Sequence, residues 1–307
     1  MSWFVGVDGG GTKTDFAVSG ADGVPAGTAR RGGCSYQAIG IEAVVSLIAD
    51  GVRECLAAVG AGLGDCAGIC LGLPCYGEDA EGDRKLRIAL AGALAPAPMY
   101  LANDVEIGWA GSLECREGIH IVAGTGSIAF GRGSDSKTAR CGGWTEFFGD
   151  EGSCYWVGRE AMSLFSKEAD GRAPRGALYD IVRRELGITE DFRFVDAILR
   201  DLSRERVASF QRYALQAANE GDRAATALYE TAANELTLMV TALKQKLCLS
   251  PGETLVSYSG GLFHAGELVL KPLRENVAEL GCVLREPKRS AVEGALILAI
   301  EQFNGRI

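Results

Sequence analysis

Histidine is scarce in this sequence, which has only His120 and His264 among its 307 residues. Zinc sites and the catalytic triads of hydrolases usually depend on histidine as a ligand or as a base. Two such residues leave little room for either arrangement. The sequence therefore disfavours a histidine-based zinc enzyme or triad hydrolase.

Basic residues are also in deficit. Lysine and arginine together number 31 against 40 acidic residues, which gives a formal net charge of −9 and a sequence pI near 5.0. A nucleic-acid-binding surface needs an excess of positive charge, so we expect no nucleic-acid partner. Phosphate binding would then depend on backbone amides and a divalent cation rather than on a lysine patch.

Long apolar runs are missing as well. The segment 291–300 is interrupted by Glu293 and Gly294, and no other stretch approaches the length of a membrane span. The first residues have neither the charged leader nor the apolar core of a signal peptide. We therefore expect a cytoplasmic protein with no membrane partner.

The ten cysteines include no C-x-x-C pair. In a cytoplasmic chain of this size, reduced and mostly buried thiols are expected rather than disulfides. A metal or iron–sulfur site among Cys66, Cys70 and Cys75 stays an alternative, because these three lie fairly close in the sequence.

The chain does contain two glycine turns of the same build. Val5–Val7 leads into the first turn, Asp8–Thr14, and Ile119–Ala123 leads into the second, Gly124–Ser127; each turn is followed by another apolar strand. Glycine lets the backbone turn sharply and approach a ligand closely, and hydroxyl groups add donors for phosphate oxygens. The pair predicts two loops that bind a polyphosphate. The expected phosphate contacts are Gly9, Gly10, Gly11, Thr12, Lys13, Thr14, Gly124, Thr125, Gly126 and Ser127, with a solvated side chain as the alternative for Lys13.

Neither turn matches the more familiar nucleotide motifs. A P-loop has lysine directly after its second glycine, whereas Thr12 follows Gly11 here. The second turn fits the pattern G-x-G-x-x-A through Ala129, but the residues Ile128–Gly131 alternate like a strand and offer no helix N-terminus. A dinucleotide-dependent oxidoreductase is therefore disfavoured.

Two aspartates follow predicted strands. Asp8 stands immediately before the first glycines, where it either caps the turn or orients Mg²⁺ beside a polyphosphate. Asp104 lies at the carboxyl end of the short strand 99–101, where ligands collect in open α/β sheets. There it either takes the proton from an attacking hydroxyl or caps the helix that follows. The spacing leaves these alternatives open.

Two later segments carry binding chemistry. In Cys141–Ser153, Trp144 is suited to stack on a sugar face and Asp150 to accept hydrogen bonds from its hydroxyls; the alternative is a glycine-rich loop anchored by tryptophan. The turn Ser259–Gly261 follows a strand and has room for an adenosine, although such turns are common.

The order of the elements indicates an α/β protein, because strands and helices alternate and the second hairpin restarts the pattern near residue 112. Ser290 and Glu293 form a capping box that opens a final helix ending at Phe303. The predicted helices are 41–59, 84–94 and 222–247, with a largely helical region at 155–218, and the predicted strands are 68–73, 99–101 and 254–258.

With these residues assembled, the sequence resembles the BadF/BadG/BcrA/BcrD ATPase family of the actin-like ATPase superfamily, and within it is most similar to N-acetylglucosamine kinases. The resemblance covers nearly the whole chain. Its most specific block is Cys141–Trp144 with Gly149–Ser153 and Tyr155–Trp156. The two glycine turns resemble the family's two phosphate loops, and Ser259, Gly260 and Gly261 resemble its adenosine loop.

The resemblance implies an α/β fold of two RNase H-like domains flanking an ATP and sugar cleft. It implies an N-terminal domain at 1–112 completed by a returning C-terminal helix at 288–307, and a C-terminal domain at 113–287 with a helical insertion. It also implies a homodimer.

The resemblance further implies ATP and Mg²⁺ as cofactors and phosphoryl transfer to the 6-hydroxyl of an amino sugar. Asp104 would be the catalytic base and Asp8 the metal residue. Sugar contacts are implied for Ser35, Asn103, Asp104, Trp144 and Asp150. N-acetylglucosamine is the expected sugar, with glucosamine as the alternative, because similar kinases often carry asparagine where this chain has the shorter Ser35.

Two functions of other classes stay open at this point. An ATPase that activates a reductive dehydratase would need cysteines placed to ligate iron, and the sequence shows no convincing pair. A non-catalytic sugar sensor would have no need of a carboxylate at position 104.

Overall fold

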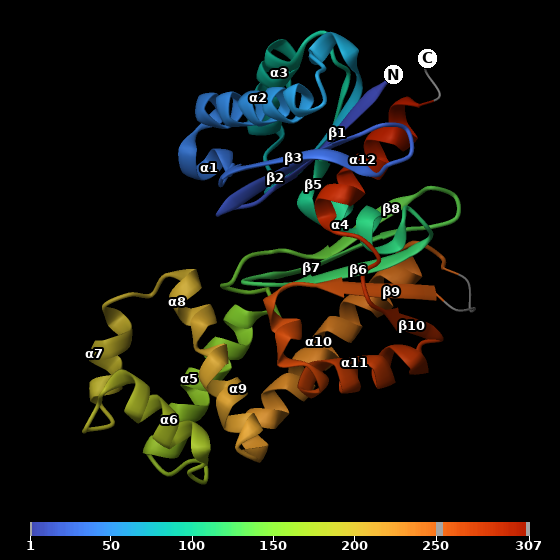
Figure 1. Cartoon of the computed structure of the whole chain (residues 1–307). Helices are drawn as coiled ribbons and strands as arrows, with labels where there is room; N and C mark the ends of the chain where they lie inside the picture. The colour runs from blue at the N-terminus through green and yellow to red at the C-terminus, as the bar shows by residue number, and fades with distance from the viewer. Residues whose placement is uncertain (1, 250–253, 305–307) are drawn as a thin grey trace. The chain divides into compact units, whose positions relative to one another are not determined.

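A computed structural model describes residues 2–249 and 254–304, and the chain divides into two compact units (Figure 1). Unit 1 comprises Met1–His120 and Glu286–Ile307, and unit 2 comprises Ile121–Arg285. The domain boundaries expected near residues 112 and 287 stay a prediction, and residues 305–307 of the expected C-terminal segment lie outside the described residues.

Unit 1 is built on a five-stranded sheet with the order β3-β2-β1-β4-β5. β1, β2 and β3 are antiparallel neighbours, whereas β4 runs parallel to β1 and β5 parallel to β4. Both faces of the central strands are covered, and this explains why β1 and β4 are almost continuously apolar. The strands are β1 (Trp3–Gly9), β2 (Lys13–Ser19), β3 (Pro25–Gly32), β4 (Cys66–Leu73) and β5 (Met99–Asn103).

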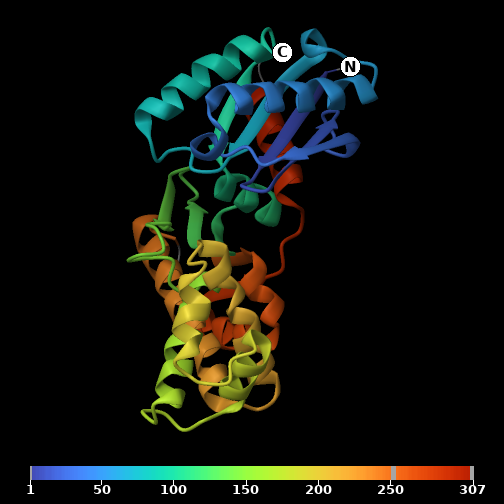
Figure 2. The same ribbon diagram turned by 90° about the vertical axis from the view of Figure 1, so that its left-hand side faces the viewer.

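Helices cover the two faces of this sheet (Figure 2). α2 (Ile41–Ala58) and α3 (Ala80–Leu94) close one face and share a core with β1, β2 and β4. α4 (Asp104–Leu113) and α12 (Ala291–Phe303) pack on the other face and against each other. The final helix therefore completes the hydrophobic core of the unit that contains the N-terminus.

The start of α12 has the capping box that the sequence predicts. Ser290 Oγ accepts from the Glu293 N–H, and Glu293 Oε2 accepts from the Ser290 N–H at 2.9 Å. Reciprocal satisfaction of two end donors stabilises a helix start, so the entry of this helix is fixed by its own first turn.

Unit 2 is built on a second five-stranded sheet with the order β10-β9-β6-β7-β8. In each sheet the order along the chain is the same, with the first strand central, the second and third on one side, and the fourth and fifth on the other. The predicted α/β class and the restart of the architecture at the second hairpin are confirmed. The strands are β6 (Gly118–Ala123), β7 (Ser127–Arg132), β8 (Thr138–Gly142), β9 (Thr254–Ser259) and β10 (Cys282–Arg285).

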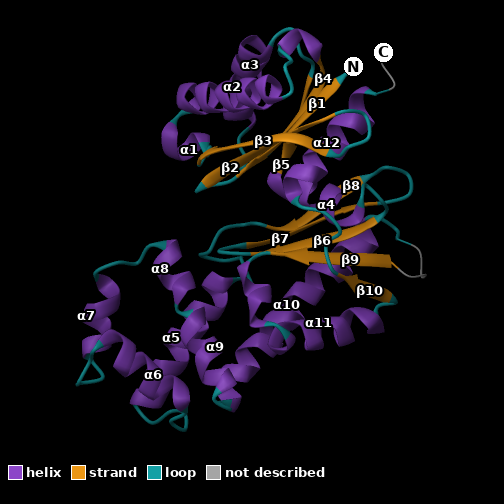
Figure 3. Cartoon of the chain, viewed as in Figure 1, coloured by secondary structure: helices purple, strands orange, loops and turns teal. Residues whose placement is uncertain are grey.

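Helices make up the rest of unit 2 (Figure 3). α10 and α11 pack together over the sheet, and the region predicted to be largely helical forms five helices before them. None of the helices in residues 2–249 and 254–304 is long and apolar enough to cross a membrane. The helices are α5 (Cys154–Ala169), α6 (Ala177–Leu186), α7 (Arg193–Leu199), α8 (Arg204–Ser209), α9 (Gln211–Asn219), α10 (Arg223–Lys246) and α11 (Glu267–Glu279).

Candidate functional site

The first glycine turn joins β1 to β2 in unit 1. The Gly10 N–H donates to the Lys13 carbonyl at 2.9 Å, and the Cys34 N–H donates to the Gly10 carbonyl at 3.0 Å. Gly11 and Thr12 are exposed, and no group in the described part of the chain accepts from their N–H groups. A turn held by backbone hydrogen bonds, with free amides at exposed residues, is an arrangement that suits phosphate oxygens.

The side chains that follow this turn differ in accessibility. Thr14 is fully buried, and its hydroxyl donates to the Gly32 carbonyl at 2.8 Å, which ties β2 to β3. Lys13 is exposed and its ammonium pairs with Asp15 at 2.9 Å. Thr12 is therefore the hydroxyl of the turn that is open to solvent, and phosphate contacts by Lys13 and Thr14 stay predictions.

Asn103 and Asp104 lie where β5 ends and α4 begins. Asn103 is the N-cap of α4: its Oδ1 accepts from the Val105 N–H at 3.1 Å, and its Nδ2 donates to the Tyr76 carbonyl at 2.9 Å. The sequence left open whether Asp104 caps this helix, and the structure gives that position to Asn103. Asp104 occupies the first helical position with its side chain exposed. A sugar contact by Asn103 stays a prediction, because both ends of its amide already have protein partners.

The electrostatic surroundings of Asp104 are unusual for an exposed carboxylate. Neighbouring protein atoms desolvate it, and together with the negative charges of Asp8 and Glu78 they raise the pKa of Asp104 to about 6. Desolvation and the charge of Asp15 likewise raise the pKa of Asp8. A carboxylate with a pKa near 6 is suited to accept a proton close to neutral pH.

Asp8 fits the requirements of a magnesium residue. No described residue donates a hydrogen bond to its carboxylate, and the nearby Asp104 adds a second hard oxygen donor. A cation here would relieve the repulsion between the two carboxylates. Among the described residues no cluster of three or more histidine, cysteine or acidic side chains encloses a metal. This is compatible with Mg²⁺, which usually binds one or two carboxylates together with water and phosphate oxygens.

Cys34 and Ser35 lie beside these carboxylates in unit 1. Cys34 is buried against Gly9, and burial, with contributions from Asp8 and Asp104, raises the pKa of its thiol. Ser35 precedes the short helix α1 (Tyr36–Ile39) and is half-buried, and no described residue hydrogen-bonds to its hydroxyl. The predicted sugar residue therefore follows directly on a residue that neighbours both carboxylates.

The second glycine turn joins β6 to β7 in unit 2. Its carbonyls are occupied by the first turn of α5: the Cys154 N–H donates to Gly124 at 2.9 Å and the Tyr155 N–H to Thr125 at 3.2 Å. No acceptor among residues 2–249 and 254–304 pairs with the N–H groups of Thr125 and Gly126. With its carbonyls bound and two amides free, this turn also fits an anion.

Asp150 lies against this turn. It is only 2% exposed and has a φ of 57°, and its Oδ1 accepts the Ser127 N–H at 3.1 Å while its Oδ2 pairs with Arg204. Ser127 Oγ donates to the Glu151 carbonyl at 2.7 Å. Trp144, on the same segment, is 73% exposed. The predicted sugar residue Asp150 is thus joined to the predicted phosphate turn, and its contact with a sugar stays a prediction.

The turn Ser259–Gly261 packs on the start of the second glycine turn. Gly260 has a φ of 110°, and a Cβ there would lie 2.4 Å from the Ala123 carbonyl group. Only glycine fits such a close approach in that conformation. The predicted adenosine turn and the predicted phosphate turn are therefore neighbours within unit 2.

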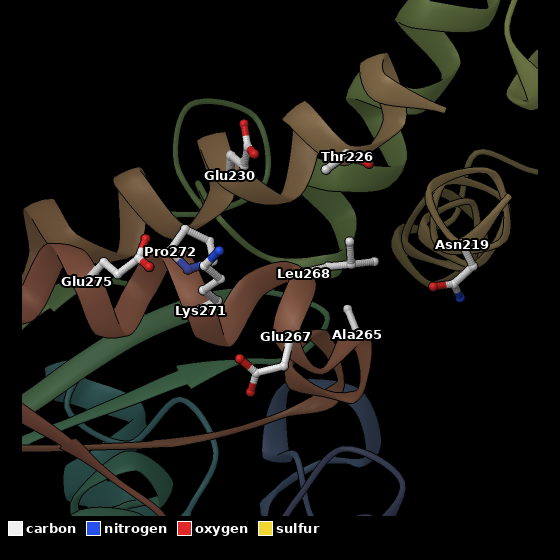
Figure 4. Close-up of a pocket in the computed structure, with 9 residues that line it drawn as sticks. All are labelled: Asn219, Thr226, Glu230, Ala265, Glu267, Leu268, Lys271, Pro272 and Glu275. Atoms are coloured by element: carbon white, nitrogen blue, oxygen red, sulfur yellow. The ribbon is translucent and has the colours of Figure 1, made fainter. Parts of the chain in front are cut away.

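A pocket of about 460 Å³ opens just beyond this turn (Figure 4). The short helix η2 (Gly261–Ala265) contributes Ala265, α11 contributes Leu268 and Lys271, and α10 contributes Thr226 and Glu230. This volume falls within the range of small-molecule pockets. Its lining combines the apolar side chains of Ala265, Leu268 and Pro272 with charged groups such as Glu230 and Lys271 (Figure 4).

Two residues of these sites were not predicted from the sequence. Cys34 carries no motif, although its position directly before the predicted Ser35 was a local signal. Arg204 lies in a polar stretch 54 residues after Asp150, and only the tertiary structure brings the two together.

The sequence of this chain is similar to that of a known protein family and of characterised kinases. The sequence model of the BadF/BadG/BcrA/BcrD ATPase family matches residues 5–299. An N-acetylmuramic acid/N-acetylglucosamine kinase of Clostridium acetobutylicum is 30% identical over 266 residues, which is 86% of each chain. An N-acetyl-D-glucosamine kinase of Dictyostelium discoideum is 25% identical over 89% of this chain and 90% of the relative.

Solved structures show the same architecture. A putative N-acetylglucosamine kinase from Chromobacterium violaceum superposes with a TM-score of 0.75 at 25% identity, covering 98% of this chain and 99% of the other. A ROK family glucokinase from Streptomyces griseus, solved with glucose and AMPPNP, has a TM-score of 0.58 at 16% identity, covering 99% and 100%. The second likeness concerns the fold alone.

Proposed function

Because the chain belongs to the BadF/BadG/BcrA/BcrD ATPase family, we propose that it is an ATP-dependent sugar kinase acting on the 6-hydroxyl of an amino sugar. The proposal depends above all on Asp104. This residue directly follows β5, is exposed to solvent, and has a carboxyl group whose pKa is raised to about 6. A base of this kind is needed to deprotonate an attacking alcohol.

We propose that the phosphates of ATP are bound by the free amides of both glycine turns. Gly11 and Thr12 contribute from unit 1, and Thr125 and Gly126 contribute from unit 2. Asp8 would hold Mg²⁺, whose charge would offset that of the phosphates. Support comes from the absence of protein acceptors for these four amides among the described residues. With a net charge of −9, the chain relies on amides and a cation rather than on lysines.

In the reaction, Asp104 accepts the proton of the sugar 6-hydroxyl while that oxygen attacks the γ-phosphorus. The bond between the γ-phosphorus and the bridging oxygen of ADP breaks, and ADP leaves with the electron pair. Since the Asp104 side chain is exposed, its proton returns to solvent after the product departs. The sugar is oriented by four side chains, those of Ser35, Asn103, Trp144 and Asp150.

The adenosine of ATP is assigned to Ser259–Gly261 and to the pocket that η2 and α11 line next to it. Two glutamates of the pocket lining, Glu230 and Glu267, repel phosphate but tolerate an uncharged base. Leu268 supplies an apolar surface for the ring.

N-acetylglucosamine is the proposed substrate, since kinases of that sugar are the curated relatives of this chain. Glucosamine is the alternative, because Ser35 offers one short hydroxyl where an asparagine would offer both an acceptor and a donor.

A coupled ADP-release assay tests the proposal with N-acetylglucosamine, glucosamine, N-acetylmannosamine and glucose as acceptors. We expect strong stimulation by N-acetylglucosamine, and phosphorus NMR of the product should show a 6-phosphate. Sugar binding without turnover across the panel would instead favour a sensor. Stimulation only by a sugar that lacks the 2-amino group would overturn the amino-sugar assignment.

A further inference from the structure

We propose that Arg204 is a positioning residue that acts through Asp150 to fix the second glycine turn. The proposal rests on the proposed function in one respect, namely that this turn binds the phosphates of ATP. All the residues involved belong to unit 2.

Arg204, Asp150 and Ser127 form a continuous chain of contacts. Arg204, at the start of α8, pairs through its Nη2 with Asp150 Oδ2. The other carboxylate oxygen of Asp150 accepts the Ser127 N–H at 3.1 Å. Because Asp150 is 2% exposed, its charge has few water contacts and depends on these two partners.

The guanidinium also lies directly against the turn. A Cβ built on Gly126 would stand 2.3 Å from Arg204 Nη2 and 2.8 Å from both oxygens of Asp150. The Gly126 backbone therefore rests on the ion pair itself. We infer that the pair, through this packing and the Ser127 N–H bond, holds the Thr125 and Gly126 N–H groups, which are the groups proposed to bind phosphate.

Arg204 also pairs with a second carboxylate, that of Glu146, which lies on the same segment as Asp150. Its Nε is 3.6 Å from Glu146 Oε2, and this buried Nε has no hydrogen-bond partner among the described residues. The carboxylates of Glu146 and Asp150 bracket the guanidinium. The planar fork of arginine can face both at once, whereas the ammonium of lysine is a single point charge.

This arrangement connects the two substrates. Asp150 and Trp144 lie on the segment proposed to hold the sugar, and Asp150 is bonded to the turn proposed to hold the nucleotide. Without Arg204, Asp150 would be a buried carboxylate without its cationic partner, and such a group moves toward water or disturbs its neighbours. The Ser127 contact would then be lost, and nucleotide and sugar binding would weaken together.

The test compares Arg204→Gln and Arg204→Lys with Arg200→Gln, which removes an exposed arginine at the end of α7. ADP affinity is measured by calorimetry with Mg²⁺ present, and kcat and KM by ADP release. For Arg204→Gln we expect about a tenfold weaker ADP affinity, the scale of one charged hydrogen bond. We also expect about a 100-fold lower kcat, the scale of a misplaced reactive group. Arg204→Lys should lie between this variant and the wild type.

Action through Asp150 is tested by the double variant Asp150→Asn with Arg204→Gln. If Arg204 works through Asp150, the double variant should match Asp150→Asn within about threefold, because contacting residues in one network are not additive. Losses that multiply would show that Arg204 acts independently and would overturn the proposal.

A purely structural role is distinguished by the kinetic constants. It would lower the melting temperature and the active fraction while leaving ADP affinity and both KM values of the folded protein unchanged, and that outcome contradicts the proposal. If Arg204→Gln does not fold, Arg204→Lys gives the same readouts with the charge retained. If the wild type phosphorylates no sugar, the proposed function fails, while ADP affinity still decides the role of Arg204.

Discussion

At the scale of single residues, Asp104 combines solvent exposure with a pKa of about 6. Its desolvation and the charge of Asp8 disfavour the ionised form, which is the form that the proposed reaction requires. In the unfolded chain the carboxyl has its ordinary pKa of 3.8, so the folded state binds this proton more tightly. As the pH rises from 3.8 to about 6, the folded state therefore loses the stability that Asp104 contributes through its tighter proton binding.

Asp104→Asn should therefore separate activity from stability. We expect kcat to fall by about 10²–10⁴-fold, the usual contribution of a general base. The melting temperature at pH 7.5 should not fall, because the variant removes a charge that the folded state disfavours. Turnover by ADP release and thermal unfolding by circular dichroism measure the two effects. Wild-type turnover, or a clear loss of stability, would contradict this assignment.

The pH dependence follows from the same pKa. A base must be ionised to act, so kcat/KM should fall as the pH drops through about 6, the pKa of Asp104. Glu78→Gln removes a negative charge that raises this pKa, so the midpoint should move to lower pH. Glu81→Gln, which removes an exposed glutamate paired with Lys85, is the control. An unchanged midpoint in Glu78→Gln would argue against Asp104 as the titrating group.

At the scale of elements, the predictable parts are those whose cause is local. α2 and α10 show apolar periodicity, and α12 carries its capping box, so the sequence locates all three. β3 was not predicted because it is an edge strand with no buried side chain to give an apolar pattern. α11 was not predicted either, because it contains Pro272, and proline normally interrupts a helix.

The site divides in the same way. The glycine turns are specified by adjacent residues, so both were predicted, together with the strand end that carries Asp104. The amide of Asn103 is also bound to the Tyr76 carbonyl, 27 residues away in the sequence, and the role proposed for Arg204 depends on its contact with Asp150. Contacts between residues distant in sequence leave no periodic or motif signal, and the sequence alone could not identify them.

The proposed binding of adenosine in the pocket beside α11 can be tested by comparing two leucines of this helix. Leu268→Ala removes an apolar group from the pocket lining, whereas Leu270→Ala shortens a half-buried leucine of the same helix outside it. Loss of a few buried methylene groups should raise the KM for ATP about 3–30-fold in Leu268→Ala, with the KM for the sugar unchanged. Equal effects of both variants on ATP would rule out the adenosine assignment.

At the scale of the whole molecule, the two sheets share one strand order, and each carries a glycine turn between its first and second strands. Each unit therefore contains one strand–glycine turn–strand motif at the same place in its sheet. We expect binding of AMPPNP with Mg²⁺ to slow hydrogen exchange at Gly11, Thr12, Thr125 and Gly126 together. Protection confined to one turn would show that only that unit binds the phosphates.

The placement of α12 has a consequence for biosynthesis. Unit 1 takes its strands from the start of the chain and α12 from its end, while unit 2 is continuous between them. During translation, β1 and β4 emerge early with α4, but they lack α12, which covers most of the same face, until unit 2 has been made. Unit 2 can thus fold on the ribosome first, while the N-terminal part of unit 1 keeps apolar surface exposed until α12 is synthesised.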